Sequence, residues 1–191
     1  IMAGSYCVVV TVANCASNPG CTNVVVNQTP SISTTGSTNP STCGGNDGTI
    51  TLSGLLNNTL YTVRYTRNGT ALGPFSLTSN GAGVVTISGL NQGAYTDFTV
   101  TLSGCQSVPV AGPINLTDPS APSAPSVSSN SPVCSGNTIN LSATGGVGAT
   151  YNWTGPLTFT SGLQNPTRAN ATVGMSGSYC ATQTIAGCVS P

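Results

Sequence analysis

The sequence contains no lysine, no glutamate and no histidine. Its charged side chains are three arginines and three aspartates, which balance to a net charge of zero: Arg64, Arg67, Arg168, Asp47, Asp97 and Asp118. A chain without a basic patch has no long-range attraction for nucleic-acid phosphates or for an anionic membrane surface. We therefore expect no nucleic acid among its partners and no membrane insertion of this segment.

The missing residue types also remove most catalytic machinery. Without histidine, lysine or glutamate, the chain cannot form a Ser-His-Asp triad, a Ser-Lys pair or a carboxylate pair containing glutamate. Asp47 lies in Gly45-Asn46-Asp47-Gly48, a pattern more typical of a turn than of a calcium loop, and a single carboxylate binds calcium weakly. The prediction is a protein that is not an enzyme, with no catalytic residue, no cofactor and no metal site.

Cysteine, in contrast, is abundant. The eight cysteines are Cys7, Cys15, Cys21, Cys43, Cys105, Cys134, Cys180 and Cys188. None of them forms a Cys-x-x-Cys pair and no histidine is present, so disulfides are expected rather than zinc. Disulfides persist in oxidising surroundings, which predicts an extracellular, cell-surface location.

One phrase occurs twice. Met2-Ala3-Gly4-Ser5-Tyr6-Cys7 is matched by Met175-Ser176-Gly177-Ser178-Tyr179-Cys180, and the segment from Thr11 to Cys15 is matched by that from Thr184 to Cys188. Each matched pair lies 173 positions apart, as Cys15 and Cys188 do. Repetition at a fixed period is typical of arrays built from structural modules. We therefore expect these residues to be one period of a longer, repetitive polypeptide.

Short apolar runs alternate with clusters of Gly, Pro, Asn and Ser, which predicts an all-β fold. The main expected strands are Tyr6–Val12, Thr22–Val26, Thr49–Leu52, Tyr61–Arg67, Thr70–Leu72, Phe75–Thr78, Val84–Ser88, Tyr95–Leu102, Val108–Val110, Thr138–Ala143, Thr150–Thr154 and Gly177–Ile185. Ala13-Asn14 and Asn68-Gly69 are the expected hairpin turns. Many short strands separated by regular turns predict tandem immunoglobulin-like β-sandwiches stapled by disulfides.

Four segments follow from this pattern. Residues 1–27 form the C-terminal hairpin of a preceding immunoglobulin-like domain, and residues 28–118 form one complete sandwich. Residues 119–125 are a Pro-rich linker, since proline favours an extended and semi-rigid spacer. Residues 126–191 form a second sandwich that lacks its last strand. The expected structural core residues are Trp153, Tyr179, Tyr6 and Tyr95.

Two sets of motifs resemble known families. Residues 122–191 and 2–29 resemble the Ig-like and PKD-like repeats of giant Bacteroidetes surface proteins, through Pro132-Val133-Cys134-Ser135-Gly136-Asn137, Tyr151-Asn152-Trp153-Thr154-Gly155-Pro156, Gln164-Asn165-Pro166 and Gly177-Ser178-Tyr179. Residues 41–117 resemble the repeats of SprB-like gliding-motility adhesins, through Cys43-Gly44-Gly45-Asn46-Asp47-Gly48-Thr49, Ile87-Ser88-Gly89-Leu90, Gly93-Ala94-Tyr95 and Gly104-Cys105. These resemblances imply export by type IX secretion and a role as an adhesin or filament shaft.

The cysteine pairing has one main scheme and one rival. Cys43 and Cys105 bracket the first sandwich, and a bond between them would close a loop of about 63 residues, worth roughly 4 kcal/mol. The Ig-like resemblance implies Cys134–Cys188. A turn centred on Asn14 brings Cys7 opposite Cys21, which leaves Cys15 and Cys180 to pair outside this window. The rival scheme is Cys15–Cys21 with Cys134–Cys180, and spacing does not choose between the two.

The leading function is therefore structural. We expect a repeat unit of an extracellular bacterial filament or giant adhesin, with neighbouring copies or repeats of itself as head-to-tail partners and with surface glycans or other cells as further partners. The alternative is a carbohydrate-binding accessory module of a secreted enzyme, in which Tyr61, Tyr65 and Phe75 would line a sugar-binding face.

Overall fold

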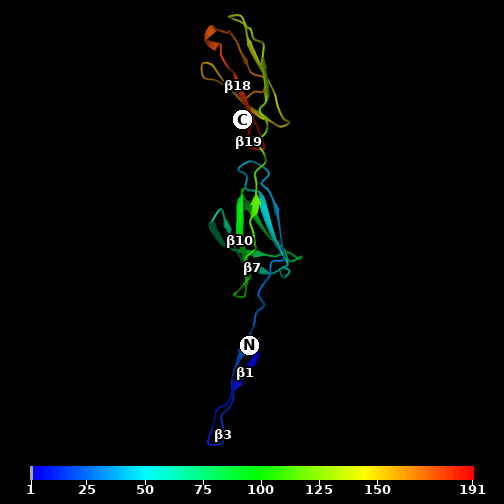
Figure 1. The fold of residues 1–191 in the computed structure, drawn as a ribbon, viewed down its shortest axis with the longest axis vertical. Coiled ribbons are helices and arrows are strands. Elements are labelled where there is room, and N and C mark those ends of the chain that lie inside the picture. The colour runs from blue at the N-terminus through cyan, green and yellow to red at the C-terminus, as the bar shows by residue number, and fades with distance from the viewer. Residues whose placement is uncertain (1) are drawn as a thin grey trace. The chain divides into compact units, whose positions relative to one another are not determined.

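A computed structural model describes residues 2–191, and the regular structure of these residues is almost entirely β (Figure 1). The one helical element in this range is a short 3-10 turn, η1 (Val173–Met175). The prediction of an all-β chain is confirmed.

The N-terminal hairpin is drawn in blue in Figure 1. β1 (Gly4–Val8) pairs antiparallel with β4 (Gly20–Val24), and the tip is formed by β2 (Thr11–Val12) and β3 (Cys15–Ala16). Ala13 and Asn14 adopt positive φ angles of 46° and 65°, the conformation that a tight two-residue hairpin turn requires. The predicted turn is therefore in place.

Two sheets contain the strands of the middle of the chain. The first is β5 (Thr34–Thr38), β6 (Gly48–Ser53) and β9 (Val85–Leu90). The second contains β11 (Cys105–Gln106), β10 (Gly93–Leu102), β7 (Leu60–Arg67), β8 (Thr70–Thr78) and β12 (Ile114–Leu116), which pairs with β10. β10 pairs antiparallel with both β11 and β7, and β7 pairs antiparallel with β8.

Some strand predictions need correction. The expected strands Thr70–Leu72 and Phe75–Thr78 are one strand, β8, whose register against β7 shifts between Val63 and Tyr65. Val108–Val110 is not a strand, because Val110 donates only a single backbone hydrogen bond, to Phe98, before the chain reaches β12. β5 was not expected, since its sequence Thr-Thr-Gly-Ser-Thr is polar and fully exposed.

Buried side chains alternate along these strands as expected for sheets with one covered face. In β6 the buried positions include Ile50 and Leu52, and in β7 they include Tyr61 and Val63. Phe98 of β10 is also fully buried. Burying a large apolar side chain contributes about 1.5–3 kcal/mol, so these rows of residues stabilise the sheets.

The C-terminal strands form two further sheets. One is β13 (Ser126–Ser129), β14 (Ile139–Thr144) and β17 (Thr167–Arg168). The other is β16 (Phe159–Ser161), β15 (Thr150–Gly155), β18 (Cys180–Ile185) and β19 (Cys188–Val189). Trp153 packs with Leu141 and Ala143 in the core, and the half-buried aromatic residues around this cluster include Tyr179.

The chain divides into two compact units, each made of several segments. One contains residues up to Gly36, Thr51–Thr86 and Tyr95–Ile114. The other contains Ser37–Ile50, Ile87–Ala94 and Asn115–Pro191. This grouping follows spatial proximity rather than chain order, and the domain boundaries at residues 28, 118 and 126 stay predictions.

Candidate functional site

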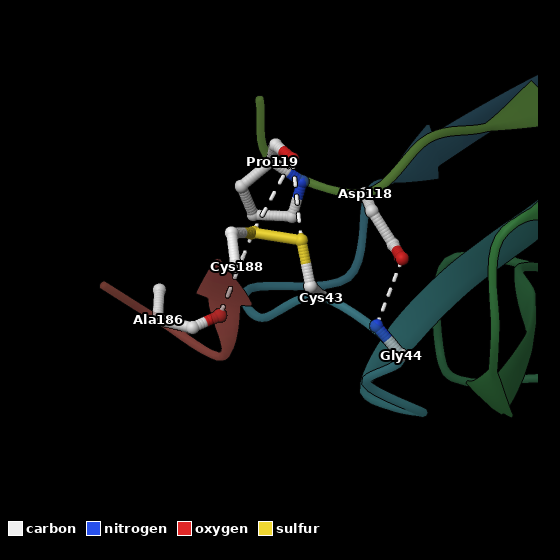
Figure 2. Close-up of a disulfide and its surroundings, with 6 residues drawn as sticks. All are labelled: Cys43, Gly44, Asp118, Pro119, Ala186 and Cys188. Carbon is white, nitrogen blue, oxygen red and sulfur yellow. Dashed lines mark hydrogen bonds between the residues drawn. A yellow bond between two sulfur atoms is a disulfide. The ribbon is translucent and has the colours of Figure 1, made fainter. Parts of the chain in front are cut away.

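The feature with the greatest structural consequence is a long-range disulfide between Cys43 and Cys188 (Figure 2). Their Cα atoms lie 5.0 Å apart, although the two cysteines are 145 positions apart in the sequence. Cys43 lies in the loop between β5 and β6, and Cys188 begins β19 and is almost fully buried. Both belong to the same compact unit.

Hydrogen bonds beside the sulfur bond connect the Cys43 loop to the turn before Cys188 and to Asp118. The amide of Cys43 donates to the carbonyl of Ala186 at 2.9 Å, and the amide of Gly44 donates to Oδ2 of Asp118 at 2.8 Å. Pro119 follows Asp118, and its carbonyl oxygen lies 3.5 and 3.4 Å from the two sulfur atoms. Figure 2 shows this arrangement, in which the loop, the hairpin turn and the start of the linker meet.

The turn before Cys188 is suited to this close approach. Gly187 has a φ of +74°, and a Cβ atom added there would lie 3.2 Å from the carbonyl oxygen of Cys43. Glycine reaches positive φ without the steric cost that other residues incur. The local sequence therefore fits the turn to the Cys43 loop.

Two expected disulfides are not formed. Cys43 bonds to Cys188, so neither Cys43–Cys105 nor Cys134–Cys188 is present. Cys105 begins β11, directly after the turn that follows β10; its thiol lies 3.6 Å from the carbonyl oxygen of Asn27, and it belongs to the other compact unit. Cys134 is an exposed thiol in the loop between β13 and β14. Bracketing a module in sequence therefore did not predict the partner of Cys43.

Cys7 and Cys21 form the second disulfide, with Cα atoms 4.0 Å apart. They face each other across β1 and β4, as the turn at Asn14 predicts. Neither bond of the rival scheme is formed: Cys15 and Cys180 are free thiols, as is Cys134.

Tyr179 makes the contacts of a tyrosine corner. Its hydroxyl donates to the carbonyl of Met175 at 3.0 Å and accepts a 2.7 Å hydrogen bond from Nη1 of Arg168. The same Nη1 donates to the carbonyl of Pro156 at 3.1 Å, and the guanidinium lies 4.8 Å from the ring centre of Phe159. Charge-assisted hydrogen bonds of this kind are stronger than neutral ones, so Arg168 fixes the tyrosine in place.

Tyr6 repeats part of this arrangement, but it is not a core residue. Its hydroxyl donates to the carbonyl of Met2 at 2.6 Å, as Tyr179 does to Met175, yet 47% of its surface is exposed. Phe159 and Arg168 pack against the ring of Tyr179, whereas Tyr6 lies on β1, whose residues are all exposed, and this explains the difference. Trp153 and Tyr95, at 1% exposure each, occupy the core as expected.

Tyr61 and Tyr65 do not form an exposed sugar-binding face. Tyr61 is 1% exposed and accepts a hydrogen bond from the amide of Leu56, and Tyr65 is 6% exposed. Phe75, which is 38% exposed, stacks on Tyr65 with ring centres 5.5 Å apart. Burial raises the pKa of Tyr65. These aromatic side chains hold β7, β8 and β10 together.

The Asp47 side chain stabilises a turn in the loop before β6. Its Oδ1 accepts a 2.9 Å hydrogen bond from the amide of Ser41. Hydrogen bonds from Ser41 lower the pKa of Asp47 below its ordinary value, and the side-chain bond has a larger effect than the backbone bond. Residues 2–191 contain no group of three or more potential metal-ligating side chains and no helix of the length and hydropathy that a membrane span needs.

Paired sheets, a buried tryptophan and a tyrosine corner together decide the architecture. The fold is immunoglobulin-like. No protein-family model and no curated protein matches the chain.

Three solved structures align with the chain over most of its length. The three fibronectin domains FN1–FN3 of chicken CNTN1 align over 98% of this chain and 74% of theirs, with 14% identity and a TM-score of 0.35. An amphioxus IgVJ-C2 molecule aligns over 85% of this chain and 95% of its own, with 13% identity and a TM-score of 0.32. A two-domain fibronectin type III segment of chicken tenascin aligns over 84% and 94%, with 13% identity and a TM-score of 0.32.

Proposed function

We propose that this chain is a structural repeat unit of an extracellular bacterial filament or giant cell-surface adhesin, joined head to tail to further copies of the same unit. Its role is mechanical: it holds a shaft together rather than transforming a substrate.

The observation that carries the proposal is that the two copies of the repeated phrase adopt the same hairpin. In the first copy the amide of Val10 donates to Oγ of Ser17 at 3.1 Å, and the amide of Ser17 donates to the carbonyl of Val10 at 2.8 Å. In the second copy Gln183 and Ser190, each 173 positions later, make the same two bonds at 3.1 and 2.8 Å. The sequence repeat is therefore a repeat of structure.

Burial supports the head-to-tail arrangement. Gln183, Cys188 and Ser190 are at most 6% exposed. Their counterparts in the first copy, Val10, Cys15 and Ser17, are exposed. Val8, Val10 and Val12 of the first copy are exposed, whereas their counterparts Ala181, Gln183 and Ile185 are buried or half-buried, so the first hairpin presents an apolar surface that has no cover in this chain. A neighbouring unit of the same kind is the partner that fits it.

Disulfides supply the strength that other cross-links cannot. The chain has no lysine, so lysine-asparagine isopeptide bonds cannot form. The Cys43–Cys188 bond connects positions 145 residues apart, so tension applied at the two ends passes through the sulfur bond instead of through the strands between them. Such a bond also requires an oxidising location, which supports an extracellular role.

The finer identity rests on the sequence resemblance. The Cys-Gly-Gly-Asn-Asp-Gly and Gly-Ser-Tyr motifs resemble SprB-like and Ig-like repeats of Bacteroidetes surface proteins, which implies type IX secretion and a part in cell adhesion or gliding motility. The same resemblance implies that surface glycans or other cells are the further binding partners.

Electron cryo-microscopy of the native assembly tests the proposal. We expect a continuous density in which the two compact units recur at a fixed spacing, with one copy per 173 residues. Isolated particles of one chain with no density next to the hairpin formed by β1 and β4 would refute it.

A further inference from the structure

Among residues 2–191 four cysteines are free, and the repeat accounts for two of them. Cys15 is the counterpart of Cys188, which is bonded to Cys43, so Cys15 corresponds to the partner of a Cys43 in a neighbouring repeat. Cys180 is the counterpart of Cys7, which is bonded to Cys21, so it corresponds to the partner of a Cys21 in a neighbouring repeat. Cys105 and Cys134 have no such counterpart in the observed bonds.

Cys134 and Cys105 lie in the same two kinds of local structure as Cys43 and Cys188, a loop and a hairpin. Cys43 and Cys134 occur in loops with the pattern Cys-x-Gly-Asn, as Cys43-Gly44-Gly45-Asn46 and Cys134-Ser135-Gly136-Asn137. Each loop directly precedes a core strand, β6 or β14. Cys134 is therefore a loop cysteine of the Cys43 kind.

Cys105 is a hairpin cysteine of the Cys188 kind. Both follow a glycine of positive φ and precede a serine by two positions, as Gly104-Cys105-Gln106-Ser107 and Gly187-Cys188-Val189-Ser190. The amide of Val100 donates to Oγ of Ser107 at 3.1 Å, and the amide of Ser107 donates to the carbonyl of Val100 at 2.9 Å. Gln183 and Ser190 make the same pair of bonds around Cys188.

The surroundings of the two hairpin cysteines also correspond. The sulfur of Cys188 lies 3.4 Å from the carbonyl oxygen of Pro119, where the chain leaves one strand group and enters the linker. The sulfur of Cys105 lies 3.6 Å from the carbonyl oxygen of Asn27, and Nδ2 of Asn27 donates to the carbonyl of Ser103 at 3.2 Å. Asn27 directly follows the repeated hairpin, so Cys105 lies where a preceding repeat joins this one.

We propose that Cys105 forms a disulfide with the counterpart of Cys134 in the preceding repeat, and that Cys134 correspondingly bonds to the counterpart of Cys105 in the following repeat. The inference rests on the proposed tandem array. Every module then bonds its loop cysteine to the hairpin cysteine of the next module, as Cys43 does to Cys188.

The spacing agrees with this rule. Adding the 173-residue offset to Cys105 places its counterpart 144 positions after Cys134, and the observed Cys43–Cys188 separation is 145. Two different junctions of the array thus use the same span of chain.

Cys134 lies at the end of its sheets from which the next repeat continues. Val133, Gly177 and Tyr179 line one depression, so the Cys134 loop lies beside the start of β18. β18 then runs away to Ile185 and the turn at Cys188. In the first copy the strand after this turn, β4, returns along β1 to the end that corresponds to the start of β18. The following repeat therefore begins at the Cys134 end.

The chemistry is an ordinary dithiol oxidation. The thiol of Cys105 and the thiol of the neighbouring Cys134 each lose one proton and together two electrons to a protein or small-molecule disulfide, which is reduced to two thiols. Both cysteines are accessible, Cys134 fully and Cys105 in part, as thiol-disulfide exchange requires.

Peptide mapping of the native protein, purified without reductant and with free thiols alkylated, tests the bond. Chymotryptic cleavage after Leu102, Leu116 and Leu141 places Cys105 in residues 103–116 and Cys134 in residues 117–141. We expect these two peptides to be found linked, with no alkylated Cys105 or Cys134. Alkylation of both thiols, or a link from either to another cysteine, would overturn the proposal.

A tryptic digest separates a bond between repeats from one within a repeat. Cleavage after Arg67 and Arg168 leaves Cys105 and Cys134 in one peptide, residues 68–168. A bond between repeats joins two or more copies of this peptide, whereas a bond within one repeat yields a single cyclised peptide, which would overturn the proposal. In Cys105→Ser material Cys134 should become alkylated, and in the control Cys43→Ser the link should persist. An imaged array without the link defeats only this inference, whereas isolated particles defeat the proposed function as well.

Discussion

The amide of Cys43 donates to the carbonyl of Ala186 at 2.9 Å, two residues before the cysteine to which Cys43 is covalently bonded. A main-chain hydrogen bond and a disulfide therefore fasten the same loop to the same hairpin turn. The hydrogen bond and the sulfur bond thus hold the two segments at the same place, with their Cα atoms 5.0 Å apart. This pairing is the basis of the proposed mechanical role.

Replacing Cys43 with serine should lower the free energy of unfolding by about 5 kcal/mol, since the bond closes a loop of 145 positions. Denaturant titration of the 191-residue chain, monitored by circular dichroism, measures the change. Cys15→Ser is the matched control, because Cys15 is exposed and unpaired, and its titration should coincide with that of the parent chain. Equal stability of both variants would contradict the assigned pairing.

Trp153→Ala should cost about 3–5 kcal/mol, because the indole is 1% exposed and packs on Leu141 and Ala143. Trp153 is also the single tryptophan, so the fluorescence of the parent chain reports on this core alone. Its emission should shift to longer wavelength on unfolding. Leu163→Ala, at a position 66% exposed, should change the stability by less than about 0.5 kcal/mol.

Arg168→Lys should destabilise the sheet containing β15 and β18 by about 1.5–3 kcal/mol. Lysine cannot reproduce the planar guanidinium that donates to Tyr179 and Pro156 and covers Phe159. Thermal unfolding followed by tryptophan fluorescence measures the effect. Arg64→Lys, on an exposed position of β7, is the control and should unfold at the parent temperature. Both substitutions keep the positive charge, so a similar loss in both variants would contradict a specific role for the contacts of the Arg168 guanidinium.

Stability should be flat from pH 7 to pH 5 and should fall only in acid. Hydrogen bonds from Ser41 lower the pKa of Asp47 in the folded chain below the ordinary 3.8. A carboxyl group whose pKa is lower in the folded chain than in the unfolded chain stabilises the fold at pH values above its unfolded pKa. This contribution is lost as the pH falls through the folded pKa. Asp47→Asn should reduce the acid sensitivity in urea titrations at pH 3 and pH 6. If the free energy of unfolding differs between pH 3 and pH 6 by the same amount in the variant and the parent chain, Asp47 does not contribute to the acid sensitivity.

Local patterns in the sequence predicted much of the fold. The turns at Ala13-Asn14 and Asn68-Gly69 were predictable because adjacent residues must reach positive φ, and the structure gives φ of 46° and 65° in the first and 47° and 82° in the second. Trp153 and Tyr95 were predictable as core because large aromatic side chains on strands are buried. The polar strand β5 gave no such signal.

The long-range disulfide was harder to predict, because cysteine spacing along a chain does not specify which loops meet in space. The assumption that a bond stays within one module favoured Cys43–Cys105, whereas Cys43 bonds across the Pro-rich segment to Cys188. A usable signal was present in the two recurring contexts, Cys-x-Gly-Asn loops and glycine-cysteine hairpins. The prediction that Tyr6 is a core residue was wrong for a related reason, since the burial of a side chain depends on packing that the local sequence does not specify.

Pulling single molecules by residues 1 and 191 tests the mechanical role most directly. Without reductant, the Cys43–Cys188 bond should exclude the residues between the two cysteines from extension, so no long unfolding step should occur. With reductant, the contour length should increase by roughly 500 Å, because each released residue spans up to about 3.6 Å. A full-length extension without reductant would contradict a load path through Cys43 and Cys188.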